Sequence, residues 1–156
     1  MYTQFFSKIN IGIVLIIIFF AGQILGAEQE GKESQALAVT VGNAIDSTIE
    51  NHKVLVENGQ AKTNINLQIV STLVSLNSQI YAMVVMFPTS KQIDRYKDME
   101  TVSRNYLKKV CRDQLTALMN DYVEKNLEYT KSNDELSKAL VSYGQSQILT
   151  IDRVLK

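Results

Sequence analysis

The chain has 156 residues, and its 16 Lys and Arg balance its 16 Asp and Glu, so its formal net charge is zero at pH 7. Such a balance gives no dominant field of either sign, which argues against nucleic acid or an anionic membrane surface as the main partner. A single cysteine, Cys111, excludes an internal disulfide framework. Stability must therefore come from packing.

The first predicted element is an uncharged, strongly apolar segment from Ile11 to Ala27. As a helix it would be about 25 Å long at about 1.5 Å per residue, slightly short of the ~30 Å hydrocarbon core of a bilayer. Lys8 precedes the segment and Glu28 follows it, and positive charge stays on the cytoplasmic side during insertion. We therefore predict that the chain after Ala27 is exported, either to the periplasm or out of the cell.

The sequence allows two fates for this apolar segment. Signal peptidase prefers small residues one and three positions before the bond that it cuts, and Ala27 suits the first position whereas Leu25 is only tolerated at the second. Residues 1–27 are thus either a cleaved signal peptide or an N-terminal anchor in the inner membrane. In both cases residues 28–156 form a helical bundle domain outside the cytoplasm, and only residues 11–27, when uncleaved, contact the membrane.

The rest of the chain has the pattern of an all-α protein. Pro88 is the only proline, and apolar residues recur at spacings of three and four along almost the whole domain. Asn58 and Gly59 are expected to close the first helix, and Pro88 cannot continue the second. The predicted helices cover residues 34–57, 63–87, 89–129 and 132–155.

Capping boxes are predicted to start the last two helices, through Thr89 with Gln92 and through Ser132 with Glu135. The apolar spacing changes phase inside the long third helix, which predicts a kink or restart within residues 98–101. Four amphipathic helices joined by short connections favour an antiparallel up-down bundle. The alternative is a pair of extended helical hairpins that complete their core only on a partner.

Two chemically interesting side chains are predicted to lie in the core. His52, the only histidine, falls on the apolar side of the first helix, which favours a neutral, hydrogen-bonded imidazole. The alternative is a haem ligand paired with a methionine, but no spacing selects the methionine. Cys111 shares a stripe with leucines, which predicts a buried free thiol, whereas an odd cysteine in an oxidising compartment also allows an intermolecular disulfide.

The predicted second helix carries no Asp, Glu, Lys or Arg from Thr63 to Ser90. One of its faces is an ordinary core stripe, and the other has small, uncharged residues at helical spacing. Because a solvated face is normally charged, we predict that the bundle itself, a second copy or another protein covers this face. The candidate partner interface consists of Gln68, Ser71, Ser75, Ser78, Gln79, Ala82 and Met86.

The sequence has no phosphate loop, paired-cysteine metal site or glycosylation sequon, and a Ser-His-Asp arrangement would have to use His52 on the apolar face, so no catalytic, cofactor-binding or metal-binding residue is predicted. In outline, an export segment followed by long helices is similar to minor pilus-type components of conjugation machinery, periplasmic helical chaperones and small secreted inhibitors. That similarity is architectural and does not fix a function. We expect a non-catalytic protein of the bacterial envelope that acts by binding a protein. The alternatives are a small-ligand or haem carrier and a secreted inhibitor or immunity protein.

Overall fold

The computed structural model describes residues 32–156, and the predicted signal or anchor segment lies outside the described residues. The described part is all-helical, as predicted. Its elements in chain order are α2 Lys32–Glu57, α3 Asn64–Met86, α4 Ile93–Val110, α5 Arg112–Tyr129 and α6 Glu135–Leu155. The first, second and last predicted helices correspond to α2, α3 and α6, and the predicted third helix is divided into α4 and α5.

The connection between α2 and α3 follows from one glycine. Gly59 has a φ of 72°, and it is the only described residue in the left-handed region. Its N–H donates to the Val56 carbonyl at 3.0 Å, and the next N–H, of Gln60, donates to the Leu55 carbonyl at 2.8 Å. This pair of bonds is a Schellman motif, which satisfies the last carbonyls of α2 and turns the chain back.

The division between α4 and α5 lies at Cys111, so the prediction of a break within residues 98–101 is wrong. Cys111 has a ψ of 18°, away from the helical value of about −42°, and the helical ladder is interrupted there. The predicted phase change rests on the apolar residues Ile93, Tyr96, Met99 and Val102, which are spaced by three. The structure instead buries Glu100 and Ser103, and Val102 is 52% exposed.

The two predicted capping boxes are also wrong, although helices start near both. The N-cap of α4 is Gln92, which makes no side-chain cap bond, and its own N–H donates to the Ser90 hydroxyl at 3.1 Å. At α6 the cap is Asp134, whose carboxylate accepts from the Ser137 N–H at 2.9 Å. A carboxylate at a helix N-terminus also meets the positive end of the helix dipole, which favours aspartate over serine in this position.

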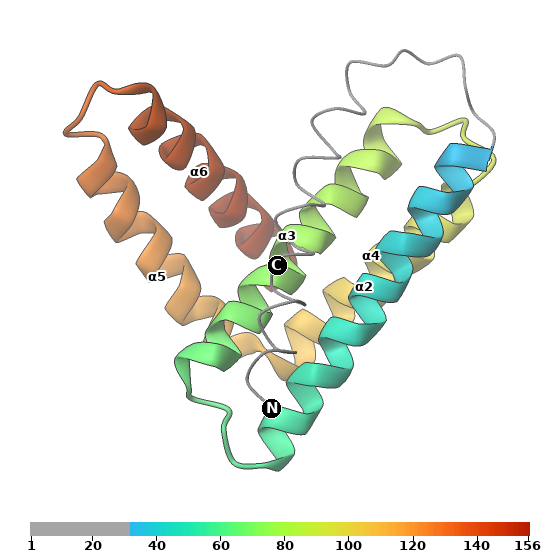
Figure 1. Ribbon diagram of the computed structural model, residues 1–156, viewed down its shortest axis with the longest axis horizontal. Coiled ribbons are helices and arrows are strands. Elements are labelled where there is room, and N and C mark those ends of the chain that lie inside the picture. The colour runs from blue at the N-terminus through green and yellow to red at the C-terminus, as the bar shows by residue number, and fades with distance from the viewer. Residues whose placement is uncertain (1–31) are drawn as a thin grey trace.

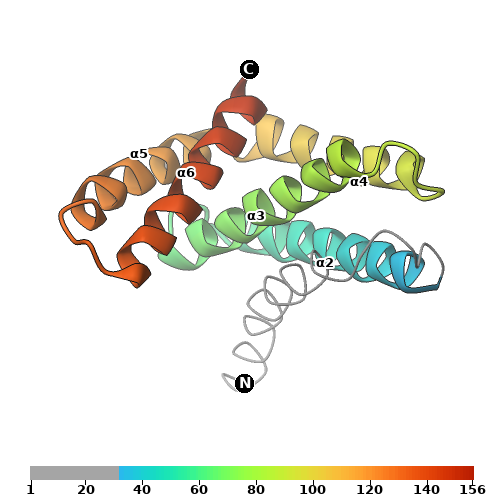
Figure 2. The same ribbon diagram turned by 90° about the horizontal axis from the view of Figure 1, so that it is seen from above.

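The five described helices form two arms that meet at an angle (Figure 1). One arm contains α2, α3 and α4, and the other is the antiparallel hairpin of α5 and α6. Figure 2 shows α3 between α2 and the end of α6. Because α3 packs against each of the other four helices, it is the central helix of the described fold. It is also long and apolar enough to cross a membrane, by length and composition only, a test that core helices of soluble proteins also pass.

The core runs along α3 and continues through the junction of the two arms. Its members are almost completely shielded from solvent, and in the junction they are Leu107, Cys111, Leu115, Ile151 and Val154. The α5–α6 hairpin is held close at Gly144, where an added Cβ would lie 2.9 Å from the Asn126 side-chain Cγ. The glycine therefore leaves room for the Asn126 side chain between the two helices, at the expense of some helix propensity.

Candidate functional site

The structure divides the predicted interface on α3 into a covered part and an open part. The Ser71 hydroxyl lies 2.6 Å from the Tyr122 hydroxyl of α5. Ser75 lies 3.1 Å from the Tyr143 hydroxyl and donates to Gln147 Oε1 at 3.1 Å, both on α6. The middle of the predicted interface is therefore hydrogen-bonded to the chain's own second arm.

The ends of the predicted interface are differently placed. Ser78, Gln79 and Ala82 are half-buried, whereas Gln68 is exposed and Met86 is 51% exposed. Thus the open part of the predicted interface consists of Gln68 at one end and Met86 at the other.

The opposing α6 helix shows the complementary pattern. Leu136, Tyr143 and Gln147 are separated by seven and four residues, so they lie on one face of α6. Gln147 is buried against α3, Tyr143 is 39% exposed, and Leu136 at the far end is 69% exposed. Leu140, which lies on the same face between Leu136 and Tyr143, is half-buried. The face is therefore buried at Gln147 and most exposed at Leu136, toward the end where the two arms diverge (Figure 1).

His52 lies in the core beside the junction of the two arms, as its position on the apolar side of the first predicted helix indicated. Its residue exposure is 1%, and its Nδ1 lies 2.9 Å from the Tyr106 hydroxyl. Burial lowers the pKa of His52 below the ordinary 6.5, which favours the neutral imidazole. Burial also raises the pKa of Tyr106 to about 12, with smaller contributions from Cys111 and Glu50. The predicted hydrogen-bonded core histidine is confirmed.

Cys111 contacts the same imidazole but does not form a reactive pair with it. Its Sγ lies 3.8 Å from Nε2 and 4.0 Å from Nδ1 of His52, nearly equal distances that place the sulfur against the ring rather than along one lone pair. Burial raises the pKa of the Cys111 thiol to about 12, so the thiol is protonated at neutral pH. The predicted buried free thiol is confirmed. An intermolecular disulfide would first require the junction to open.

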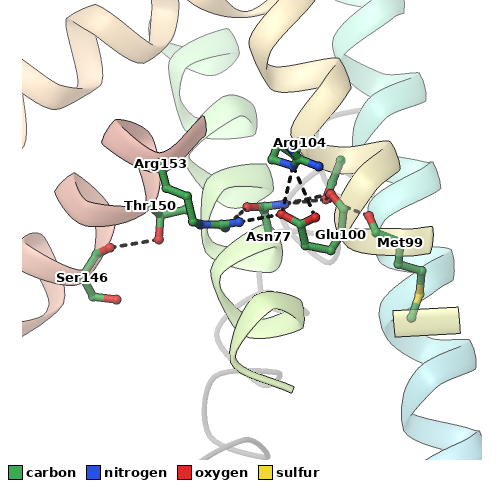
Figure 3. A network of polar contacts seen from close by, with 8 residues as sticks. Asn77, Met99, Glu100, Arg104, Ser146, Thr150 and Arg153 are labelled. Atoms are coloured by element: carbon green, nitrogen blue, oxygen red, sulfur yellow. Dashed lines mark hydrogen bonds and ion pairs between the residues drawn. The ribbon is translucent and has the colours of Figure 1, made fainter. Parts of the chain in front are cut away.

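A polar network that was not predicted from the sequence holds the C-terminal end of α6 against α3 and α4 (Figure 3). Arg153 of α6 forms an ion pair with Glu100 of α4, with 2.5 Å between Nη1 and Oε1, and also donates to Asn77 Oδ1 of α3. Asn77 Nδ2 in turn donates to the Glu100 carbonyl at 3.2 Å and to the Ser103 hydroxyl at 2.8 Å. Arg104 supplies a second cation 3.3 Å from Glu100.

The network joins three helices and leaves its buried members paired. Glu100 is 8% exposed and Asn77 is fully buried, so each needs these partners to offset its lost hydration. The guanidinium of Arg153 also lies 3.9 Å from the centre of the Tyr81 ring, a cation–π contact. The available sequence signal was Asn77 itself, a polar residue on the core stripe of an uncharged helix.

A surface groove of about 540 Å³ lies between α2 and α4. Its floor includes Ile49 and Tyr106, and Glu50, Lys53 and Lys109 stand at its rim, so both charge signs border it. Among the residues that the structure describes, no group of three or more His, Cys, Asp and Glu side chains is placed to hold a metal ion.

In comparisons with protein-family models, with curated proteins and with solved structures, nothing matches the chain. The fold alone therefore defines its class, and in the described residues it is an all-helical protein with two arms and an incompletely covered central helix.

Proposed function

We propose that this chain is an exported, non-catalytic helical protein that acts by binding another protein in the bacterial envelope. The observation that carries the proposal is a set of exposed apolar side chains on the two arms, Leu136 on α6 and Val85 and Met86 on α3, which are 69%, 58% and 51% exposed. Val85 and Met86 are neighbours in the segment from Thr63 to Ser90, which carries no Asp, Glu, Lys or Arg, and exposed apolar groups in such a segment mark interfaces. We call this set of residues the arm surface.

The export half of the proposal rests on the apolar segment from Ile11 to Ala27, with Lys8 before it and Glu28 after it. This charge order supports a location of residues 28–156 in the periplasm or at the outer face of the inner membrane. The partner then completes the core that the α5–α6 hairpin leaves open at its tip. This arrangement corresponds to the predicted extended helical hairpins that complete their core on a partner, which is the alternative to an antiparallel four-helix bundle within one chain.

The proposal is tested with the full chain, expressed in its native envelope and isolated in mild detergent. We expect it to migrate in a complex larger than one chain, and Leu136→Glu to weaken that complex by roughly tenfold or more, because the new carboxylate loses hydration in the interface. The matched control is Val54→Glu, at a valine on α2 that is 46% exposed. If both variants retain the complex equally, the arm surface is not the binding site. A wild-type chain that is isolated without any bound protein contradicts the proposed function.

A further inference from the structure

His52 is the last buried side chain of α2. The buried residues that precede it on this helix recur every three or four positions, and they are Ala38, Val41, Ile45 and Ile49. After His52, none of residues 53–65 is buried, although this segment includes the last turn of α2 and the whole connection to α3. The connection contacts α5 through a hydrogen bond from Gln114 Nε2 to the Ala61 carbonyl, at 3.3 Å. The imidazole is therefore the last buried anchor of α2.

The surface that His52 packs against is the corner between α4 and α5, where the chain passes from the first arm to the second (Figure 1). Cys111 forms this corner, and its Sγ lies 3.8 Å from His52 Nε2. Tyr106, near the end of α4, places its hydroxyl 2.9 Å from His52 Nδ1. Burial raises the pKa of both Tyr106 and Cys111 to about 12, so neither partner is charged at neutral or mildly acidic pH.

The helices that pack against α2 offer the imidazole no carboxylate. They are α3 and α4. α3 carries no Asp, Glu, Lys or Arg, and its one tyrosine, Tyr81, lies against Arg153. On α4, Glu100 is paired with Arg153, and the charged residues that follow it are all cations, namely Arg104, Lys108 and Lys109.

The acidic groups of α2 and α5 near the corner are engaged or exposed. Glu50 is exposed and pairs with Lys53 at 3.4 Å. Asp46 and Glu57 of α2 and Asp113 in the first turn of α5 are exposed. Burial lowers the pKa of His52, and no charged group among the described residues contributes to that shift. A proton on this imidazole would therefore have no counter-charge.

We infer that His52 is an acid-released latch, which lets the end of α2 leave the α4–α5 corner when the imidazole takes up a proton. An imidazolium has two N–H donors, whereas the ring lies beside one hydroxyl and one thiol sulfur, and sulfur is a weak acceptor. A buried charge without these partners is costly. The ring reaches water with least loss of packing when the end of α2 moves outward, because residues 53–65 are not buried. This inference goes beyond the proposed function and does not depend on it.

Cys111, the only cysteine of the chain, reports the release because the imidazole covers its sulfur. The full chain in mild detergent is treated with a dipyridyl disulfide, which also reacts with thiols in acid. The rate at each pH is divided by the rate of the denaturant-unfolded chain at the same pH. This normalised rate should rise roughly threefold to tenfold from pH 7 to pH 5.5, a range above the ordinary titration of carboxylates.

Two kinds of variant separate the latch from other causes. His52→Gln and His52→Leu replace the imidazole with side chains that do not titrate, and in each the normalised rate should be the same at pH 7 and pH 5.5. A chain with Cys111→Ala and Ala38→Cys carries its thiol at a fully buried position in the first half of α2. That thiol should stay protected at pH 5.5, because only the end of α2 is released.

Three results would overturn the inference. They are a wild-type rate that does not change with pH, a rise that persists in a folded His52 variant, and an equal rise in the Ala38→Cys chain, which would indicate unfolding of the whole helix. If neither His52 variant folds, the ring-proton resonance of the wild-type chain decides, because His52 is the only histidine. The imidazole should remain mostly neutral at pH 6.5 and take up its proton below it. A ring that is half protonated at pH 6.5 or above would contradict the latch.

Discussion

Replacing Arg153 with methionine removes the cation that links α6 to Glu100 and Asn77. The methionine retains most of the aliphatic stem, so the main loss is the ion pair, whose Nη1–Oε1 distance is 2.5 Å. Breaking one partner of a buried ion pair costs about 3–5 kcal/mol. The Arg153 side chain is 25% exposed and Glu100 retains Arg104 at 3.3 Å. We therefore expect a loss of about 2 kcal/mol in the free energy of unfolding, below that range.

Denaturant unfolding followed by circular dichroism at 222 nm measures this loss. The matched control is Lys138→Met, because the Lys138–Glu135 pair is highly exposed, with side chains 57% and 95% accessible. That change should alter stability by no more than about 0.5 kcal/mol. The double variant Arg153→Met with Glu100→Gln should lose less than the sum of the single changes, because no unpaired carboxylate is left. Equal effects of Arg153→Met and Lys138→Met would refute the structural role of the network.

Three further changes probe the core and the junction. Leu118→Ala should cost about 2–5 kcal/mol in thermal or denaturant unfolding, whereas exposed Asn105→Ala should stay within about 0.5 kcal/mol; equal losses would mean that the helical phase is wrong. Gly144→Ala should destabilise the α5–α6 hairpin despite the better helix propensity of alanine, because its Cβ would meet the Asn126 side chain; a stabilised variant would show that the two helices are not closely packed there. Since the pKa of folded His52 lies below the unfolded 6.5, the folded state binds fewer protons and stability falls as pH decreases below 6.5. His52→Gln should reduce this pH dependence in unfolding titrations between pH 7.5 and 5, and an unchanged slope would contradict a neutral core histidine.

Helix type and approximate length could be read from the sequence wherever burial follows hydrophobicity. The ends of α2 and α3 were predictable because Gly59 and Pro88 act locally, through a left-handed φ and a missing N–H. The position of His52 was predictable for the same reason, since it shares a stripe with Ile45 and Ile49. These features depend on residues that are close in sequence.

The break at Cys111 and the polar network could not be predicted, because both depend on contacts between helices that are distant in sequence. From the sequence alone Glu100 is expected to be exposed to solvent, because its partner Arg153 is 53 positions away. Because Glu100 is buried, the buried side of α4 does not follow the apolar spacing. The break therefore lies at Cys111 and not within residues 98–101. The uncharged face of α3 was recognised, but its division into a covered and an open half follows only from the angle of the second arm.

Site-specific photo-crosslinking in cells tests the central claim most directly. A photoreactive phenylalanine analogue replaces Leu136 of the full chain in its native envelope, and Glu124 is replaced in the control. The account predicts an adduct larger than the chain from position 136, recovered in the membrane or periplasmic fraction, and little or none from position 124. Crosslinks that are equally weak at both positions, or adducts found only in the cytoplasm, would contradict an exported protein that binds through the arm surface.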